Sequence, residues 1–148
     1  MQTFAALLER LVLTPSRNAK LQLICDYLRH TSDPSRGWAL AALTGELSFD
    51  AVKPAFIRKA VEARMDAQLF AWSYDYVGDL AEAVSLVWPA QPGANREPEL
   101  SEVIDGLQSE TRAEAQARIE GWLDALPQAR ERWALLKLVT GGLRVGLS

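Results

Sequence analysis

Apolar residues recur at a helical spacing along almost the whole chain, and proline and glycine interrupt this pattern at intervals. Such a spacing places the apolar side chains on one face of each helix, where they can pack on a common core. No segment alternates apolar and polar residues as a half-buried strand does, and no unit repeats at a fixed period. The pattern therefore predicts an all-α fold, a single compact domain of about eight to ten helices.

Capping and helix-breaking residues divide this pattern into separate helices. Thr3 is a predicted N-cap of the first helix, and Asp33 followed by Pro34 is a predicted start of the third. Asp79 and Glu82 have the spacing of a capping box at another helix start. The predicted helical segments are 4–12, 16–28, 34–42, 55–65, 69–76, 80–87, 100–107, 111–126 and 129–139, with a surface loop over 89–98.

Composition fits one globular domain. The chain has 148 residues, 49% of them hydrophobic and 24% charged, and no apolar run approaches the roughly 18 residues that span a membrane. Glu9 and Arg10 interrupt the first apolar stretch, which a signal peptide would not tolerate. We therefore expect a cytoplasmic monomer that does not bind membranes. The single cysteine, Cys25, lies in a helical apolar pattern and is expected to be buried as a small hydrophobic residue.

The net charge of −3 hides an uneven distribution of charged residues. Residues 1–64 hold nine Lys/Arg against six Asp/Glu, residues 65–136 hold five against thirteen, and residues 137–148 hold two against none. The ends of the chain are thus basic and the middle is acidic. This asymmetry allows a basic face that the total conceals, although solvated helix surfaces explain most charge runs.

Residue patterns typical of a catalytic centre are absent from the sequence. The only histidine, His30, falls at a polar helix end, where a solvated helix terminus is the simpler interpretation. Neither a Walker-type phosphate loop nor a dinucleotide fingerprint occurs. The acidic residues of 97–124 recur without histidine or cysteine and indicate a solvated helix face rather than a metal site. We therefore expect a binding module rather than an enzyme.

Two local features place backbone N–H groups and small residues where another molecule could approach. Gly78 precedes Asp79 at a predicted helix start, and helix starts bind phosphates. The glycines of 141–146 surround Arg144. Simpler interpretations remain open, since Gly78 can be a helix stop and the glycines at 141 and 142 a C-cap or a linker.

Three stretches of the chain carry a family resemblance. They are TPSRNAKL at 14–21, SYDYVGDLAE at 73–82 and GGLRVGL at 141–147. In this order and distribution they resemble the N-terminal DNA-binding domain of ATP-dependent DNA ligases. The resemblance spans nearly the whole chain, and residues 89–135 match only in helical character.

The resemblance implies a helical domain that lies on the minor groove on both sides of a nick. It would hold duplex DNA through phosphates without sequence preference, because nick joining has to work at any sequence. The arginine of the glycine-rich turn would enter the groove or meet phosphate, and the basic residues at the second and fourth helix starts would bind phosphates. The residues expected to contact DNA are Arg17, Lys20, Lys53, Gly78, Gly142, Arg144 and Gly146.

Nick joining itself belongs, in that family, to a nucleotidyltransferase domain whose Lys-x-Asp-Gly lysine takes AMP from ATP. No lysine of this chain is followed by x-Asp-Gly. The resemblance therefore implies that residues 1–148 are the first domain of a ligase serving DNA repair, replication or recombination, without its catalytic and oligonucleotide-binding (OB) domains. ATP and Mg²⁺ would belong to the parent enzyme, no cofactor is expected here, and the catalytic domain would be a partner in cis.

A helical protein-interaction domain is the alternative from a different class. In that case the tryptophans and the acidic middle of the chain would dock a partner protein. The acidic total also departs from the more basic domains of the family's larger members, so we expect weak, salt-sensitive DNA binding. Basic residues on one concave face would favour DNA, and scattered basic residues beside an exposed tryptophan patch would favour a protein.

Overall fold

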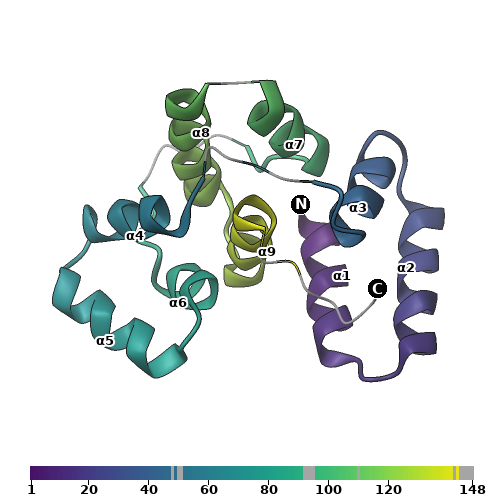
Figure 1. Cartoon of the computed structure of the whole chain (residues 1–148), viewed down its shortest axis with the longest axis horizontal. Helices are drawn as coiled ribbons and strands as arrows, with labels where there is room; N and C mark the ends of the chain where they lie inside the picture. The colour runs from purple at the N-terminus through teal and green to yellow at the C-terminus, as the bar shows by residue number, and fades with distance from the viewer. Residues whose placement is uncertain (48, 50–51, 92–95, 110, 142, 144–148) are drawn as a thin grey trace.

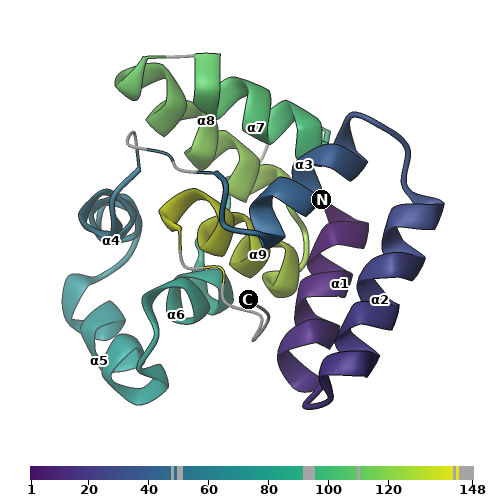
Figure 2. The ribbon, with the colours of Figure 1, turned by 45° about the vertical axis from the view of Figure 1, so that its right-hand side comes forward.

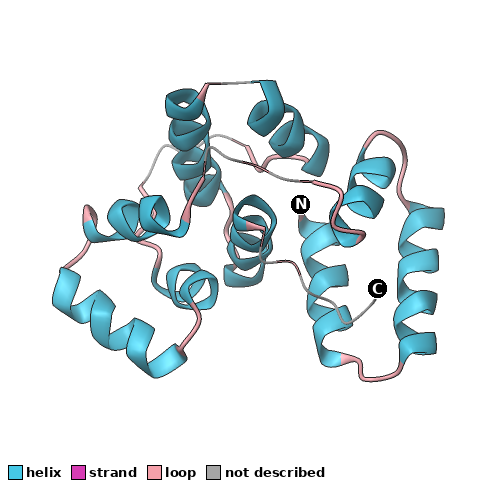
Figure 3. Cartoon of the chain, viewed as in Figure 1, coloured by secondary structure: helices cyan, strands magenta, loops and turns pink. Residues whose placement is uncertain are grey.

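The structure, a computed structural model, describes residues 1–47, 49, 52–91, 96–109, 111–141 and 143. Within these ranges it contains nine α-helices and no strand, which confirms the predicted all-α fold (Figures 1 and 3). The helices are α1 (Gln2–Leu13), α2 (Arg17–His30), α3 (Ser35–Leu43), α4 (Pro54–Glu62), α5 (Ala67–Val77), α6 (Leu80–Val87), α7 (Leu100–Ser109), α8 (Arg112–Ala125) and α9 (Ala129–Thr140).

Helix α9 is the centre of the fold. It packs against α1 on one side and α6 on the other, and Figures 1 and 2 show it between a group formed by α1 to α3 and a group formed by α4 to α6. Its buried residues are Glu131, Ala134, Leu135, Leu136, Leu138 and Val139. These positions surround most of the helix circumference, as expected for a helix enclosed by others.

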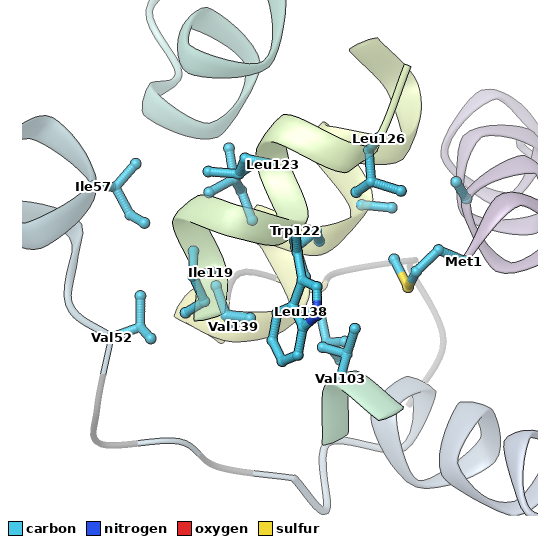
Figure 4. Packing of buried hydrophobic residues seen from close by; sticks show 14 of the residues in the cluster. Met1, Val52, Ile57, Val103, Ile119, Trp122, Leu123, Leu126, Leu138 and Val139 are labelled. Carbon is cyan, nitrogen blue, oxygen red and sulfur yellow. The ribbon is translucent and has the colours of Figure 1, made fainter. Parts of the chain in front are cut away.

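The core is continuous from the first residue to the last helix. Met1 and Phe4 are buried beside α9, and Trp122 and Leu123 of α8 cover α9 from another direction (Figure 4). Burial of apolar surface stabilises such a core by about 25 cal/mol per Å². Because Met1 and Phe4 are buried in this core, the N-terminal segment contributes to the stability of the fold.

Arg64, Asp124 and Trp88 link the end of α4 to the ends of α6 and α8. The Arg64 guanidinium donates to both carboxylate oxygens of Asp124, with Nη1–Oδ1 at 2.5 Å and Nη2–Oδ2 at 3.1 Å. Trp88 Nε1 donates to Asp124 Oδ1 at 2.9 Å, and the guanidinium carbon lies 4.3 Å from the centre of the Trp88 ring. Arg64 Nη1 also donates to the carbonyl of Pro89 at 3.1 Å. This network fixes three helices at one point.

Two predicted helix starts are wrong. Helix α1 begins directly after Met1, so Thr3 lies inside the helix and does not cap it. Helix α3 begins at Ser35 with Pro34 as its N-cap. The Asp33 carboxylate, one residue before this N-cap, accepts from Arg36 Nη2 at 2.7 Å. The predicted N-caps, Thr3 and Asp33, lie two residues and one residue away from the observed ones, Met1 and Pro34.

The predicted burial of Cys25 is also wrong, because its side chain is exposed. Helix α2 has no fully buried residue and packs on α1 through Leu23, Ile24 and Tyr27. The ring centroid of Tyr27 lies 6.4 Å from that of Phe4. With Leu23, Ile24 and Tyr27 packed on the core, Cys25 lies on a face of α2 that is exposed to solvent.

Candidate nucleic-acid interface

The turn between α1 and α2 carries the first group of predicted DNA contacts. Ser16 caps α2, since its Oγ accepts the Ala19 N–H at 3.3 Å. Arg17 is the first residue of α2 and is exposed, and the first turn of this helix holds no acidic residue. The N–H groups of Arg17 and Asn18 have no acceptor among the described residues. This helix end therefore combines unused backbone donors, the positive end of a helix dipole and a guanidinium.

Two more basic residues lie in the helix turns on either side of this connection. Arg10, which the sequence analysis did not single out, is exposed in the last turn of α1. It makes no ion pair within the described ranges. Lys20 is partly buried and interacts with another group of the chain. Arg10 was missed because a basic residue near a helix C-terminus is expected anyway from the helix dipole.

Lys53 is placed at the start of α4, as the sequence suggested. It is the N-cap of this helix, its side chain is exposed, and Pro54 follows at the first helical position. No acidic residue lies in the first turn. Lys59, further along α4, is also exposed. Both ammonium groups lack an ion-pair partner in the part of the chain that is described.

Gly78 ends α5 with a left-handed backbone, φ +83°, which favours glycine. Its N–H donates to the Tyr74 carbonyl at 2.7 Å and so is not available to a phosphate. Asp79 is the N-cap of the next helix, α6. Its carboxylate accepts from the Glu82 N–H and from Lys137 Nζ, each at 2.8 Å. Gly78 therefore has no free backbone N–H for a ligand. It only allows close approach, because it is exposed and has no side chain.

The Asp79 carboxylate at this helix start is ionised and is paired with the Lys137 ammonium. Burial alone would raise the pKa of Asp79, but the hydrogen bonds from Lys137 and from the Glu82 N–H outweigh it and hold that pKa below its ordinary value. The carboxylate therefore stays ionised at neutral pH. It occupies the position that a phosphate would take at the start of α6.

The glycine-rich turn lies almost wholly outside the described residues. This applies to Gly142, Arg144 and Gly146, and their predicted DNA contacts stay predictions. Gly141 is described, and it ends α9 as a C-cap with φ +75°. Of the interpretations left open for this glycine, the structure shows the C-cap.

The described candidates do not form one cluster. Arg17 and Lys20 belong to α2 and Lys53 to α4, and both views of the ribbon place α2 and α4 on opposite sides of α9 (Figures 1 and 2). A single small anion cannot bridge them. Only a ligand that extends across the molecule can contact both groups.

Most of the other basic side chains are already paired. Within the described ranges, cations meet carboxylates in the pairs Arg29–Asp26, Arg36–Asp33, Arg58–Glu62, Arg64–Asp124, Arg96–Glu102, Arg130–Glu9 and Lys137–Asp79. The exposed cations without such a pair there are Arg10, Arg17, Lys53 and Lys59. These four side chains can neutralise phosphates without first giving up an internal partner.

Histidine and possible metal-binding residues form no site among the described residues. His30 is exposed at the end of α2, and its Nδ1 lies 2.7 Å from the carbonyl oxygen of Asp26. In the described part of the chain, His, Cys, Asp and Glu form no group of three or more that could hold a metal ion. Among the same residues, no helix is both long and apolar enough to cross a membrane.

Comparison with known proteins adds no assignment. No protein-family model matches the chain, and no curated protein matches it.

Proposed function

We propose that this chain is the N-terminal DNA-binding domain of an ATP-dependent DNA ligase and that it holds nicked duplex DNA through phosphates. The start of α2 carries the proposal. There, an exposed arginine, unused backbone N–H groups and a first turn without acidic residues coincide with the TPSRNAKL stretch of the family resemblance. Anions bind such helix starts through the dipole and the free N–H groups together.

A duplex is the ligand that suits the separation of the basic groups. Arg17 on α2 and Lys53 on α4 lie on opposite sides of α9, and a phosphate backbone offers charges at regular intervals along its length. Contacts made only through phosphate carry no sequence information. Gly78 is left out of this proposal, because the ionised Asp79 carboxylate occupies the adjacent helix start. The glycine-rich turn completes the proposal. It would enter the minor groove through Gly142, Arg144 and Gly146.

The isolated domain should bind weakly. Its net charge is −3, and six of its twelve arginines face carboxylates within the described ranges, so few cations remain to release counterions from DNA. We expect dissociation constants on the order of micromolar or weaker. Nick joining, with its ATP and Mg²⁺, would be performed by the catalytic domain of the parent ligase. The proposal includes a cytoplasmic location and a monomeric domain.

A titration of fluorescent nicked duplex with wild-type and variant chains tests the proposal. Arg17→Ala should weaken binding at low salt by about three- to tenfold on every duplex sequence, and should reduce the salt slope by about one. Arg29→Ala is the matched control, because Arg29 lies at the other end of α2 and is already paired with Asp26 at 3.6 Å. Equal losses in both variants, or a loss confined to one DNA sequence, would refute phosphate binding at the start of α2.

The protein-interaction alternative is favoured by two observations. The described basic candidates do not lie on one face, because α2 and α4 are on opposite sides of α9. Leu69, Trp72 and Tyr76 form a stripe along α5 and are 52%, 62% and 93% exposed. Exposed aromatic side chains at this spacing are typical of surfaces that dock another protein. A chain that binds no duplex even at low salt would leave this alternative as the better explanation.

A further inference from the structure

A groove lies between α1, α6 and the start of α9. Its volume is about 420 Å³, with walls formed by Val12 and Leu13 of α1 and by Leu86 of α6, and with Trp133 of α9 in its lining. The groove is distinct from the start of α2 and from Lys53, neither of which lines it. A concave site of this size accepts several apolar side chains of a ligand.

The walls of the groove are apolar and open to solvent. Val12 is 52% exposed, Leu13 is 76% exposed and Leu86 is 58% exposed. These side chains come from two helices, α1 and α6, so the apolar surface is shared between them and does not belong to a single helix face. Apolar residues gathered around a concave site are typical of binding surfaces.

The uncompensated charge of the groove is negative. Arg130 Nη1 lies 3.6 Å from Glu9 Oε1, so this cation already faces a carboxylate. Glu82 is exposed and makes no ion pair within the described residues. Of the two carboxylates that line the groove, Glu82 is therefore the one without a cation partner among the described residues. Phosphates are repelled here, and a second copy of the chain would bring like charges together.

We propose that this groove binds an amphipathic helix of a partner protein, with an apolar row between Leu13 and Leu86 and a lysine or arginine opposite Glu82. Apolar anchors on one helix face commonly fill a groove between helices. The positive charge of the partner then complements Glu82 and selects against acidic helices. This proposal does not rest on DNA binding, because it uses another surface and a ligand of opposite charge.

The probe is a fluorescent leucine/lysine helical peptide of about 15 residues, compared with the same peptide carrying glutamate in place of lysine. Wild-type chain should bind the lysine peptide about tenfold more tightly. Leu86→Ser should weaken that binding by about fivefold. Leu40→Ser is the matched control, because Leu40 is 45% exposed on α3 and does not line the groove. Circular dichroism checks that each variant keeps its helices.

A charge exchange supplies the second arm of this experiment. Glu82→Lys should reverse the preference, so that the glutamate peptide binds more tightly than the lysine peptide. Glu46→Lys changes the net charge equally at an exposed position that does not line the groove, and should leave the preference unchanged. The proposal fails if the lysine peptide does not bind, if Leu86→Ser and Leu40→Ser have equal effects, or if Glu46→Lys reverses the preference as Glu82→Lys does.

Discussion

Replacing Arg64 with methionine should cost the fold a large share of its stability. The Arg64 and Asp124 side chains are only 10% and 11% exposed and form a two-bond pair. Removing one partner of a buried pair costs about 3–5 kcal/mol. Trp88 and the Gln91 N–H still donate to the remaining carboxylate, so we expect a loss of about 2–4 kcal/mol.

Urea unfolding followed by circular dichroism measures this loss. With an m-value of about 2 kcal/mol/M, the midpoint should fall by about 1–2 M. Arg29→Met is the control, because the Arg29 and Asp26 side chains are 70% and 51% exposed, and such pairs contribute below about 1 kcal/mol. Equal midpoints for wild type and Arg64→Met, or equal losses in both variants, would refute the structural role of the pair.

The same variant should change the acid sensitivity of the fold. Burial alone would raise the pKa of Asp124, but donation from Arg64, Trp88 and the Gln91 N–H outweighs it and lowers that pKa. The stabilisation is therefore complete above the ordinary carboxyl pKa of about 3.9 and disappears as the pH falls through the lowered value. Without Arg64, acid unfolding should begin at a higher pH. An unchanged acid midpoint would show that Arg64 does not hold this carboxylate ionised.

Three further predictions concern single residues. Glu131 is fully buried with unpartnered carboxylate oxygens in the described structure, and burial, then the charge of Glu97, raises its pKa. Because this pKa is raised in the folded state, stability falls as the pH rises from the ordinary glutamate pKa of about 4.3 through the raised pKa. Glu131→Met should therefore be more stable than wild type by about 1 kcal/mol at pH 8, measured by urea unfolding. A less stable variant would contradict this. Gly78→Ala should lose about 1 kcal/mol because φ is +83°, and an unchanged urea midpoint would exclude backbone strain there. Cys25 should react with a thiol reagent in the native state at nearly the rate of the unfolded chain, whereas strong protection would contradict its exposure.

Local sequence signals predicted much of the fold. Gly78 stops α5, Asp79 caps α6 and Gly141 ends α9, because each of these features depends on a few neighbouring residues. The rotation of α2 was not predictable in this way. It follows from the packing of Leu23, Ile24 and Tyr27 on the core, which local sequence does not determine, and Cys25 is left exposed.

The candidate site was predictable only as a list of basic residues. Sequence spacing indicates pairs such as Arg58–Glu62, four residues apart. It does not indicate a pair such as Arg64–Asp124, whose members are separated by 60 positions. The structure leaves Arg17 and Lys53 exposed and unpaired within the described ranges, and partly buries Lys20. It also reveals Arg10 as a further exposed cation at the same turn.

The central claim is that the chain binds duplex DNA through phosphates and without sequence preference. Its most direct test is the salt dependence of wild-type binding to two nicked duplexes of unrelated sequence. We predict equal affinities on the order of micromolar at low salt, with parallel losses of affinity as salt rises, by about 0.9 log units per log unit of salt for each phosphate contacted. No binding at low salt, or affinities that differ strongly between the two sequences, would contradict the claim.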